Sequence, residues 1–198
     1  MLRLAKQKNE ISSSANTGDV KTILGITFKL FLISTITAIL LSGVNALTVD
    51  RIAENARAEK AAAIAEIFSG NIESELFESP IGGIAELYVV KESGNAVGYA
   101  AQVEPLGFGG TMTVMVGVNA DGTLAGVKLV SHSETPGLGS RAGDQEYLSQ
   151  YIGKGAESLN GGIDIITGST ISSNAILEAV NTALTAHHTV FAANGGAK

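Results

Sequence analysis

An uninterrupted apolar stretch near the N-terminus constrains this chain more than any other feature. Residues 26–47 read ITFKLFLISTITAILLSGVNAL, and Lys29 is their only charged residue. A helix rises about 1.5 Å per residue, so this length crosses about 30 Å of hydrocarbon. Lys29 lies near one end, where its long side chain can reach the headgroups. We therefore expect a cytoplasmic tail at 1–25, a transmembrane helix at 26–47 and a folded domain at 48–198.

Charge is distributed unevenly along the chain. Residues 1–45 carry five basic and two acidic side chains, a net charge of +3, so the remainder carries −9 of the total of −6. The positive-inside rule then places the N-terminus in the cytoplasm and the folded domain outside it, in the cell (inner) membrane. A cleaved signal peptide, with its apolar core at 30–41 and its cleavage site at 44–46, is the alternative, and it also exports the domain.

The composition excludes several classes of partner and site. The 198 residues include no cysteine, which excludes disulfides, Cys-ligated zinc and Cys-bound iron–sulfur clusters. An acidic domain also argues against nucleic acid as a partner, because phosphate contacts need clustered Lys and Arg. We identify no metal site and no catalytic residue in the sequence. Redox chemistry on this chain would therefore use a bound organic cofactor or a metal site without cysteine ligands.

The exported part mixes helical and strand-like patterns. An Ala- and Glu-rich stretch predicts a helix that continues or follows the membrane span, and four Val-rich runs predict two antiparallel hairpins. Acidic residues Glu73 and Glu75 are expected in a surface loop. The ranges are a helix at 48–69, strands at 84–90, 96–103, 111–118 and 124–130, and a final helix at 172–190. This order predicts an α+β fold.

The first loop with possible chemistry spans residues 132–139 and reads HSETPGLG, directly after a predicted strand. Its glycines and proline impose an irregular backbone, and it combines an imidazole, a carboxylate and a hydroxyl. It is either a tight turn with a polar rim or a platform for a flat, polar ligand. Phe108 lies among glycines. It could either stack on the ring of a ligand or pack into the core.

The second segment spans residues 164–173 and reads DIITGSTISS. We expect the apolar pair at 165–166 to end a strand and a helix to begin after it. Thr170 then lies at a helix N-terminus, where unpaired backbone N–H groups and the helix dipole favour a phosphate. The alternative is a plain N-capping run, because Ser and Thr cap helices generally.

These two segments carry a resemblance to a known family. Residues 107–140, GFGGTMTVMVGVNADGTLAGVKLVSHSETPGLGS, and residues 164–170, DIITGST, resemble the FMN-binding domain family. That family includes the G subunit of the Rnf electron transport complex and the C subunit of the sodium-pumping NADH:quinone reductase. Its attachment motif reads Asp, two variable residues, Ser or Thr, Gly, Ala, then Ser or Thr. Here Ser169 stands where the family usually has Ala.

The resemblance implies a cofactor and its site. FMN would be joined to the Thr170 hydroxyl through a phosphoester, and a separate Mg-dependent flavin transferase would donate it from FAD. The motif residues carried over are Asp164, Thr167, Gly168, Ser169 and Thr170. By the same resemblance we expect the isoalloxazine edge to be lined by Glu134, Thr135, Gly137 and Leu138.

The implied function is that of a redox subunit with no complete active site of its own. The short chain favours the Rnf G subunit, with the other subunits of the ion-translocating ferredoxin:NAD⁺ oxidoreductase and the lipid bilayer as partners. NAD binding by this chain is not expected, because no GxGxxG follows a predicted strand. Two alternatives stay open: a flavinylated carrier for another extracytoplasmic system, or an anchored scaffold domain without redox chemistry.

Overall fold

The structure is a computed structural model. It describes the backbone of residues 2–77, 81–159 and 161–193, and the side chains of residues 20–77, 81–159 and 161–191. The chain divides into two compact units, Met1–Asn55 and Ala56–Lys198, and each is described by itself.

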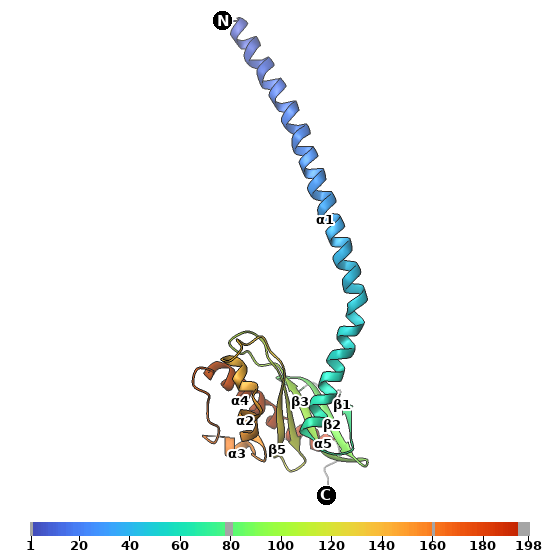
Figure 1. Cartoon of the computed structure of the whole chain (residues 1–198), viewed down its shortest axis with the longest axis vertical. Coiled ribbons are helices and arrows are strands. Elements are labelled where there is room, and N and C mark those ends of the chain that lie inside the picture. Colours follow the sequence, from blue (N-terminus) through green and yellow to red (C-terminus); the bar gives the residue numbers. More distant parts are fainter. Residues whose placement is uncertain (1, 78–80, 160, 194–198) are drawn as a thin grey trace. The chain divides into compact units, whose positions relative to one another are not determined.

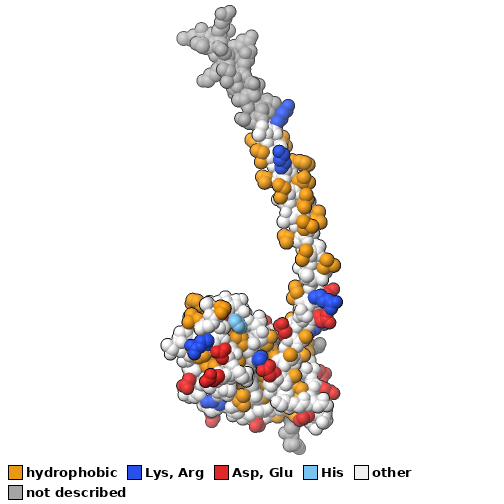
Figure 2. All heavy atoms as spheres, viewed as in Figure 1, with side chains coloured by type: hydrophobic (Ala, Val, Ile, Leu, Met, Phe, Trp, Pro, Cys, Tyr) orange, Lys and Arg blue, Asp and Glu red, His pale blue; other side chains and the backbone are white. Residues whose placement is uncertain are grey.

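The first unit is helical and apolar. Helix α1 spans Leu2–Ile67 without a break, so the helix expected at 48–69 is confirmed and is continuous with the apolar stretch. Within Val20–Ile67 the most apolar window has a mean hydropathy of 2.1, and none of it is buried. Figure 2 shows hydrophobic side chains exposed along this helix. This is the property expected of a membrane anchor, because lipid would cover that surface. The sequence predicts that the membrane span begins after residue 25 and ends at residue 47. Both positions lie inside α1, so no helix end marks them and they stay predictions.

The threonine hydroxyls in the apolar stretch are satisfied within the helix. Thr27, Thr35 and Thr37 each donate a hydroxyl hydrogen bond to the carbonyl four residues earlier, at 2.8–2.9 Å. Because hydrocarbon offers no alternative partner, this arrangement lowers the cost of burying these hydroxyls in lipid.

The second unit is built on one antiparallel sheet whose strand order follows the chain (Figure 1). The four expected strands are confirmed, with the third beginning slightly later than predicted. The strands are β1 (Ile72–Leu76), β2 (Ile84–Glu92), β3 (Asn95–Val103), β4 (Thr113–Asn119) and β5 (Leu124–Ser131). The expectation of a loop around Glu73 and Glu75 is wrong, because both lie on β1. After its first residue this edge strand is exposed, so its sequence lacks the alternation of apolar and polar residues typical of a half-buried strand. Backbone pairing with β2 holds it in place.

Both hairpin turns follow from local chemistry. Ser93 and Gly94 have φ of 51° and 84°, the left-handed pair that a two-residue type I′ turn requires. In the second turn Asp121 Oδ1 accepts hydrogen bonds from the Thr123 backbone N–H at 2.9 Å and from its hydroxyl at 2.7 Å. Turn chemistry read from the sequence therefore located both hairpins.

One face of the sheet is covered by helix α4 (Thr170–Thr185), which buries Ile176, Ala179, Val180 and Ala183 in the main core. The Tyr99 hydroxyl, on β3, donates to the Ala183 carbonyl at 2.8 Å and ties sheet to helix. The helix expected at 172–190 is interrupted at Ala186 and continues as α5 (His187–Ala193). Short helices fill the β5–α4 connection: η1 (Gly139–Gly143), α2 (Gln145–Leu148), η2 (Ser149–Tyr151) and α3 (Ala156–Leu159).

The opposite face receives the C-terminal end of α1. Ala63, Ile64 and Phe68 form a second buried cluster with Ala100 and Met115 of the sheet. Glycines in the strands make room for this contact: a Cβ on Gly117 would collide with Ile67 Cγ2 and lie 2.9 Å from the Phe68 ring. The sheet is thus sandwiched between α4 and the last turns of α1.

Replacing Gly117 by alanine should therefore destabilise the second unit. The added methyl group overpacks a buried contact, and such changes typically cost about 1–3 kcal/mol. We expect a lower midpoint in urea unfolding followed by circular dichroism. Gly126→Ala is the matched control, because a Cβ there lies 3.4 Å from Ile67 Cγ2. Equal midpoints for Gly117→Ala and Gly126→Ala would contradict this packing.

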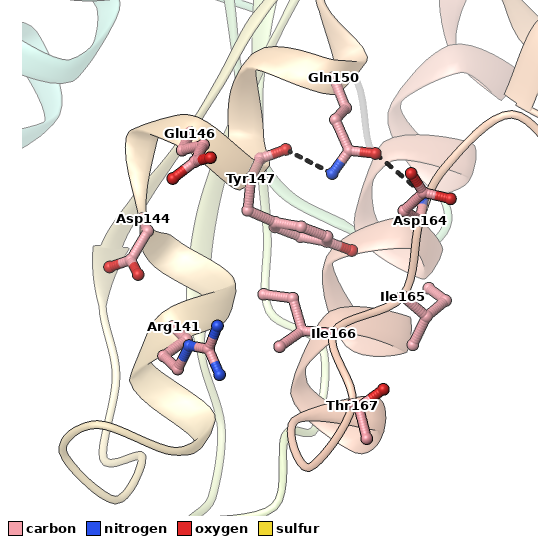
Figure 3. A pocket seen from close by; sticks show the side chains of 9 residues that line it. All are labelled: Arg141, Asp144, Glu146, Tyr147, Gln150, Asp164, Ile165, Ile166 and Thr167. Carbon is pink, nitrogen blue, oxygen red and sulfur yellow. Dashed lines mark hydrogen bonds between the residues drawn. The ribbon is translucent and has the colours of Figure 1, made fainter.

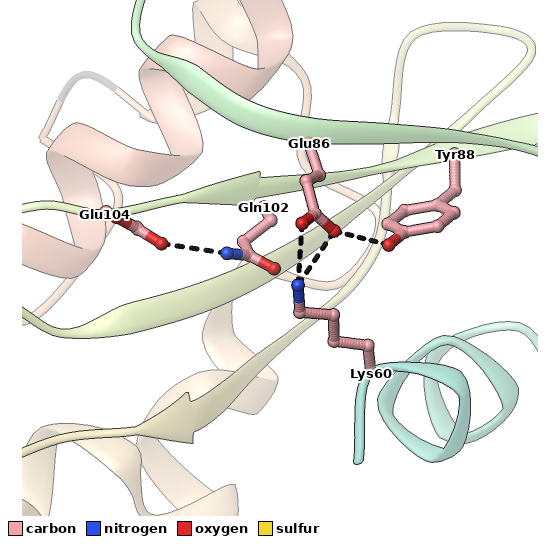
Figure 4. A network of polar contacts seen from close by, with 5 residues as sticks. All are labelled: Lys60, Glu86, Tyr88, Gln102 and Glu104. Carbon is pink, nitrogen blue, oxygen red and sulfur yellow. Dashed lines mark hydrogen bonds and ion pairs between the residues drawn. The ribbon is translucent and has the colours of Figure 1, made fainter. Parts of the chain in front are cut away.

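An ion pair also joins α1 to the sheet (Figure 4). Lys60 Nζ lies 2.8 Å from both carboxylate oxygens of Glu86, and the Tyr88 hydroxyl donates to the same carboxylate. The hydrogen bond from Lys60, followed by that from Tyr88, lowers the pKa of Glu86 below 4.5. Burial, with the hydrogen bond to Glu86, raises the pKa of Tyr88 to about 12.

This lowered pKa predicts acid sensitivity. Because the folded-state pKa of Glu86 lies below 4.5, its contribution to stability is present above that pH. This contribution to stability is lost as the pH falls through the pKa of Glu86 in the folded state. The pair is partly exposed, so we expect an effect within about 1 kcal/mol. Unfolding free energies of wild type and Glu86→Gln should converge between pH 5 and about 3; a constant difference across that range would reject the assignment.

Candidate functional site

The first turn of α4 presents a free hydroxyl and free amides. Thr170 is its first residue, as the sequence predicted, and its side chain is exposed. Among the described residues, nothing accepts a hydrogen bond from the Thr170 hydroxyl or from the N–H groups of Thr170, Ile171 and Ser172. Such a turn is suited to a phosphate, because its N–H groups and dipole attract negative charge.

The structure does not support the alternative that residues 169–173 are only an N-capping run. Ser169 occupies the N-cap position but makes no side-chain capping hydrogen bond. Its hydroxyl instead donates to the Gly139 carbonyl at 3.3 Å, and the residue is buried. The hydroxyl that distinguishes Ser169 from the family's usual Ala therefore has a partner of its own. The apolar pair expected to end a strand, residues 165–166, is not in a strand.

A buried carboxylate joins two loops to this turn. Glu134 is 5% exposed; its Oε1 accepts from the Gly109 N–H at 3.0 Å and its Oε2 from the Ser172 hydroxyl at 2.9 Å. A Cβ on Gly107 or Gly139 would collide with this carboxylate, so both glycines are needed for the close approach. Glu134 thus fixes the β3–β4 connection and the loop after β5 to the N-terminus of α4.

His132 and Gly137 shape the loop that carries Glu134. His132 Nδ1 accepts a hydrogen bond from the Glu134 backbone N–H at 3.1 Å. Gly137 has a φ of 74°, in the left-handed region, and its N–H donates to Ser140 Oγ at 2.9 Å. Both contacts are local, so they set the backbone of the loop.

A pocket of about 250 Å³ lies beside Thr170 and brings together the two segments singled out in the sequence. Six of the nine predicted site residues line it: Glu134, Thr135, Leu138, Gly168, Ser169 and Thr170. The remaining lining residues, which sequence reasoning did not assign to the site, are Phe108, Gly139, Ile171 and Ser172. Phe108 is 70% exposed, so the possibility that it packs in the core is wrong. Gly137 is outside this lining.

The attachment motif is divided between two pockets. Asp164 and Thr167 line a separate pocket of about 430 Å³ with Arg141 and Gln150 (Figure 3). There the Asp164 backbone N–H donates to Gln150 Oε1 at 2.9 Å. Gly168 has a φ of 85°, and the loop passes there from one pocket to the other. Asp164 and Thr167 therefore do not share a pocket with the Thr170 hydroxyl.

Two family models match this chain. A family model described as an FMN-binding domain matches residues 107–185, and one described as the RnfG N-terminal region matches residues 16–67. The crystal structure of Shewanella oneidensis NqrC aligns with a TM-score of 0.46 and 20% identity, covering 61% of this chain and 68% of that chain. Both segments of the candidate site lie within the FMN-binding match.

Two curated relatives also match this chain. In Methanosarcina acetivorans, the G subunit of the ion-translocating oxidoreductase complex is 36% identical over 101 residues, covering 48% of this chain and 54% of that protein. In Acetobacterium woodii, the G subunit of the Na⁺-translocating ferredoxin:NAD⁺ oxidoreductase complex is 32% identical over 188 residues, covering 82% and 90%. Because that match extends over most of both proteins, the chain belongs to the family of G subunits of ion-translocating oxidoreductase (Rnf) complexes.

Proposed function

We propose that this chain carries FMN as a phosphoester on Thr170 and transfers electrons within a membrane-bound, ion-translocating ferredoxin:NAD⁺ oxidoreductase complex. The other subunits of that complex and the lipid bilayer are its partners. The match to the Acetobacterium woodii protein over 82% of this chain supports the role, and the FMN-binding match over residues 107–185 supports the cofactor.

The attachment proposal rests mainly on the surroundings of the Thr170 hydroxyl. An exposed hydroxyl without a partner stands at the start of α4, beside three N–H groups that also lack partners in the described residues. A phosphate esterified to this hydroxyl would lie next to those N–H groups, which favour its negative charge. The adjoining pocket would take part of the flavin.

Attachment would need a second protein. A threonine hydroxyl is a weak nucleophile unless a base activates it, and no described carboxylate or imidazole is hydrogen-bonded to Thr170. A flavin transferase would supply the base. Thr170 Oγ1 would then form the new P–O bond to the FMN phosphate of FAD, with AMP as the leaving group when the pyrophosphate bond breaks. The proton from the hydroxyl would pass to the transferase.

When bound, FMN supplies one- and two-electron redox chemistry that no side chain of this chain offers. The residues of the chain hold it in place and shape its surroundings. Helix α1 would anchor the protein in the cell membrane. The basic N-terminal tail would lie in the cytoplasm and the flavin domain would lie outside it. A covalent link would then retain the cofactor where free FMN is dilute.

Intact-mass spectrometry tests the proposal directly. The full chain is produced with and without a flavin transferase, and the expected result is an added mass equal to FMN minus water only in the first case. The denatured band should also fluoresce as a flavin in SDS gels. A bare polypeptide after production with an active transferase would overturn the proposal.

A further inference from the structure

The larger pocket, of about 430 Å³, lies on the other side of Gly168 from the Thr170 pocket, and the function proposed above does not explain it (Figure 3). Asp164 and Thr167 of the predicted motif line one part of it. The rest of its polar lining comes from the short helices between β5 and α4, for which the sequence indicated no role. Those residues are Arg141, Asp144, Glu146, Tyr147 and Gln150.

The charged side chains of this pocket are exposed, and none of their charged ends has an ion pair or a hydrogen bond among the described residues. Three carboxylates and one guanidinium give the lining a formal net charge of −2. One unpaired charge on a surface needs no explanation, but four around a single cavity create a field that favours a partner with positive charge. The four residues are Arg141, Asp144, Glu146 and Asp164.

Contacts behind the pocket hold its shape. Tyr147, which is 5% exposed, forms part of the wall, and its hydroxyl lies 3.1 Å from that of Tyr151. Gln150 Oε1 accepts from the Asp164 backbone N–H at 2.9 Å, and Gln150 Nε2 donates to the Tyr147 carbonyl at 3.3 Å (Figure 3). One amide therefore joins both walls. A preformed pocket binds a partner at a lower cost in entropy, because little has to be ordered.

The position of the pocket along the chain selects the partner. Thr167 lines it and Thr170 follows three residues later, a length of chain that spans no more than about 11 Å. An enzyme that modifies Thr170 has to contact the surface around that residue. On one side the flavin would occupy the pocket of about 250 Å³. The acidic pocket on the other side of Gly168 is left for contact with the enzyme itself.

We propose that this pocket docks the flavin transferase, which inserts a basic side chain that pairs with Asp144 and Glu146. The proposal rests on the attachment function proposed above and deepens it, because it adds a second contact for the enzyme outside the predicted motif. Asp144 and Glu146 bind the enzyme and take no part in the chemistry at Thr170. Removing one of these charges should therefore weaken docking and leave the chemical step unchanged.

A neutral substitution with a matched control tests the docking site. The full chain in detergent is treated with transferase and FAD, and flavin fluorescence in SDS gels gives the initial rate at each chain concentration. Glu146→Gln should raise the concentration at half-maximal rate several-fold with an unchanged maximal rate, and added salt should affect it less than wild type. Glu157→Gln should match wild type. Glu157 is also an exposed glutamate in the first turn of a four-residue helix, but it is outside the pocket.

Direct binding separates docking from attachment. In a Thr170→Ala background, which has no hydroxyl to modify, Glu146→Gln should weaken equilibrium binding of the transferase several-fold and Glu157→Gln should not. Equal binding by the two variants would overturn the docking site, and so would a Glu146→Gln chain that lowers only the maximal rate. Both results leave attachment to Thr170 standing. A wild-type chain that acquires no flavin would overturn the proposed function, and the binding measurement would still decide the docking site.

Discussion

Replacing Thr170 by alanine should abolish covalent flavin while leaving the fold intact. The side chain is exposed and makes no hydrogen bond within the described residues, so the substitution removes no structural contact. Alanine also suits the first turn of a helix. We expect no flavin fluorescence on the denatured band and no added mass, with an unfolding midpoint close to that of wild type.

Three further substitutions make this result specific. Thr170→Ser keeps a hydroxyl at the same position and should retain attachment. Thr167→Ala changes a residue of the predicted attachment motif that lines the other pocket, so it should lower the amount of flavin attached without moving the attachment away from Thr170. Ser169→Ala restores the family's usual residue and loses only the bond to the Gly139 carbonyl. Full flavinylation of Thr170→Ala, with the mass located on another residue, would refute the assignment of the attachment site.

Replacing Glu134 by alanine should be the most damaging change near the site. It removes the acceptor for the Gly109 N–H and for the buried Ser172 hydroxyl, and it leaves a void between glycines that fit around the carboxylate. Unsatisfied polar groups cost about 1–3 kcal/mol each, so we expect a loss of roughly 2–4 kcal/mol. Urea unfolding of the chain without flavin measures this loss separately from any effect of the cofactor.

Glu134→Gln is the control for this prediction. Its side chain has nearly the same shape, its oxygen can still accept from Gly109 and its amide can donate to the Ser172 hydroxyl. Most of the stability should therefore return. If alanine and glutamine variants unfold at the same denaturant concentration as wild type, Glu134 does not join the loops in the way the contacts indicate.

Much of the fold was predictable because its signals are local. The apolar stretch, the Val-rich strands and the Asp121-Gly122 turn each depend on residues within a few positions of one another. The same holds for Thr170, where a run of small hydroxylated residues precedes a helical pattern. Strand β1 was missed because its polar, exposed residues resemble a loop, and only pairing with β2 makes it a strand.

The arrangement of the candidate site was not predictable, because its contacts join distant parts of the chain. Glu134 reaches Gly109 across 25 residues and Ser172 across 38, and no local pattern encodes either contact. The sequence by itself determined the long apolar helix, four of the five strands of the sheet and a hydroxyl at a helix start. The tertiary structure alone decided that Phe108 faces outward and that Asp164 lies in a different pocket from Thr170. The physical reason is that the direction of a loop side chain is set by what packs beneath its backbone.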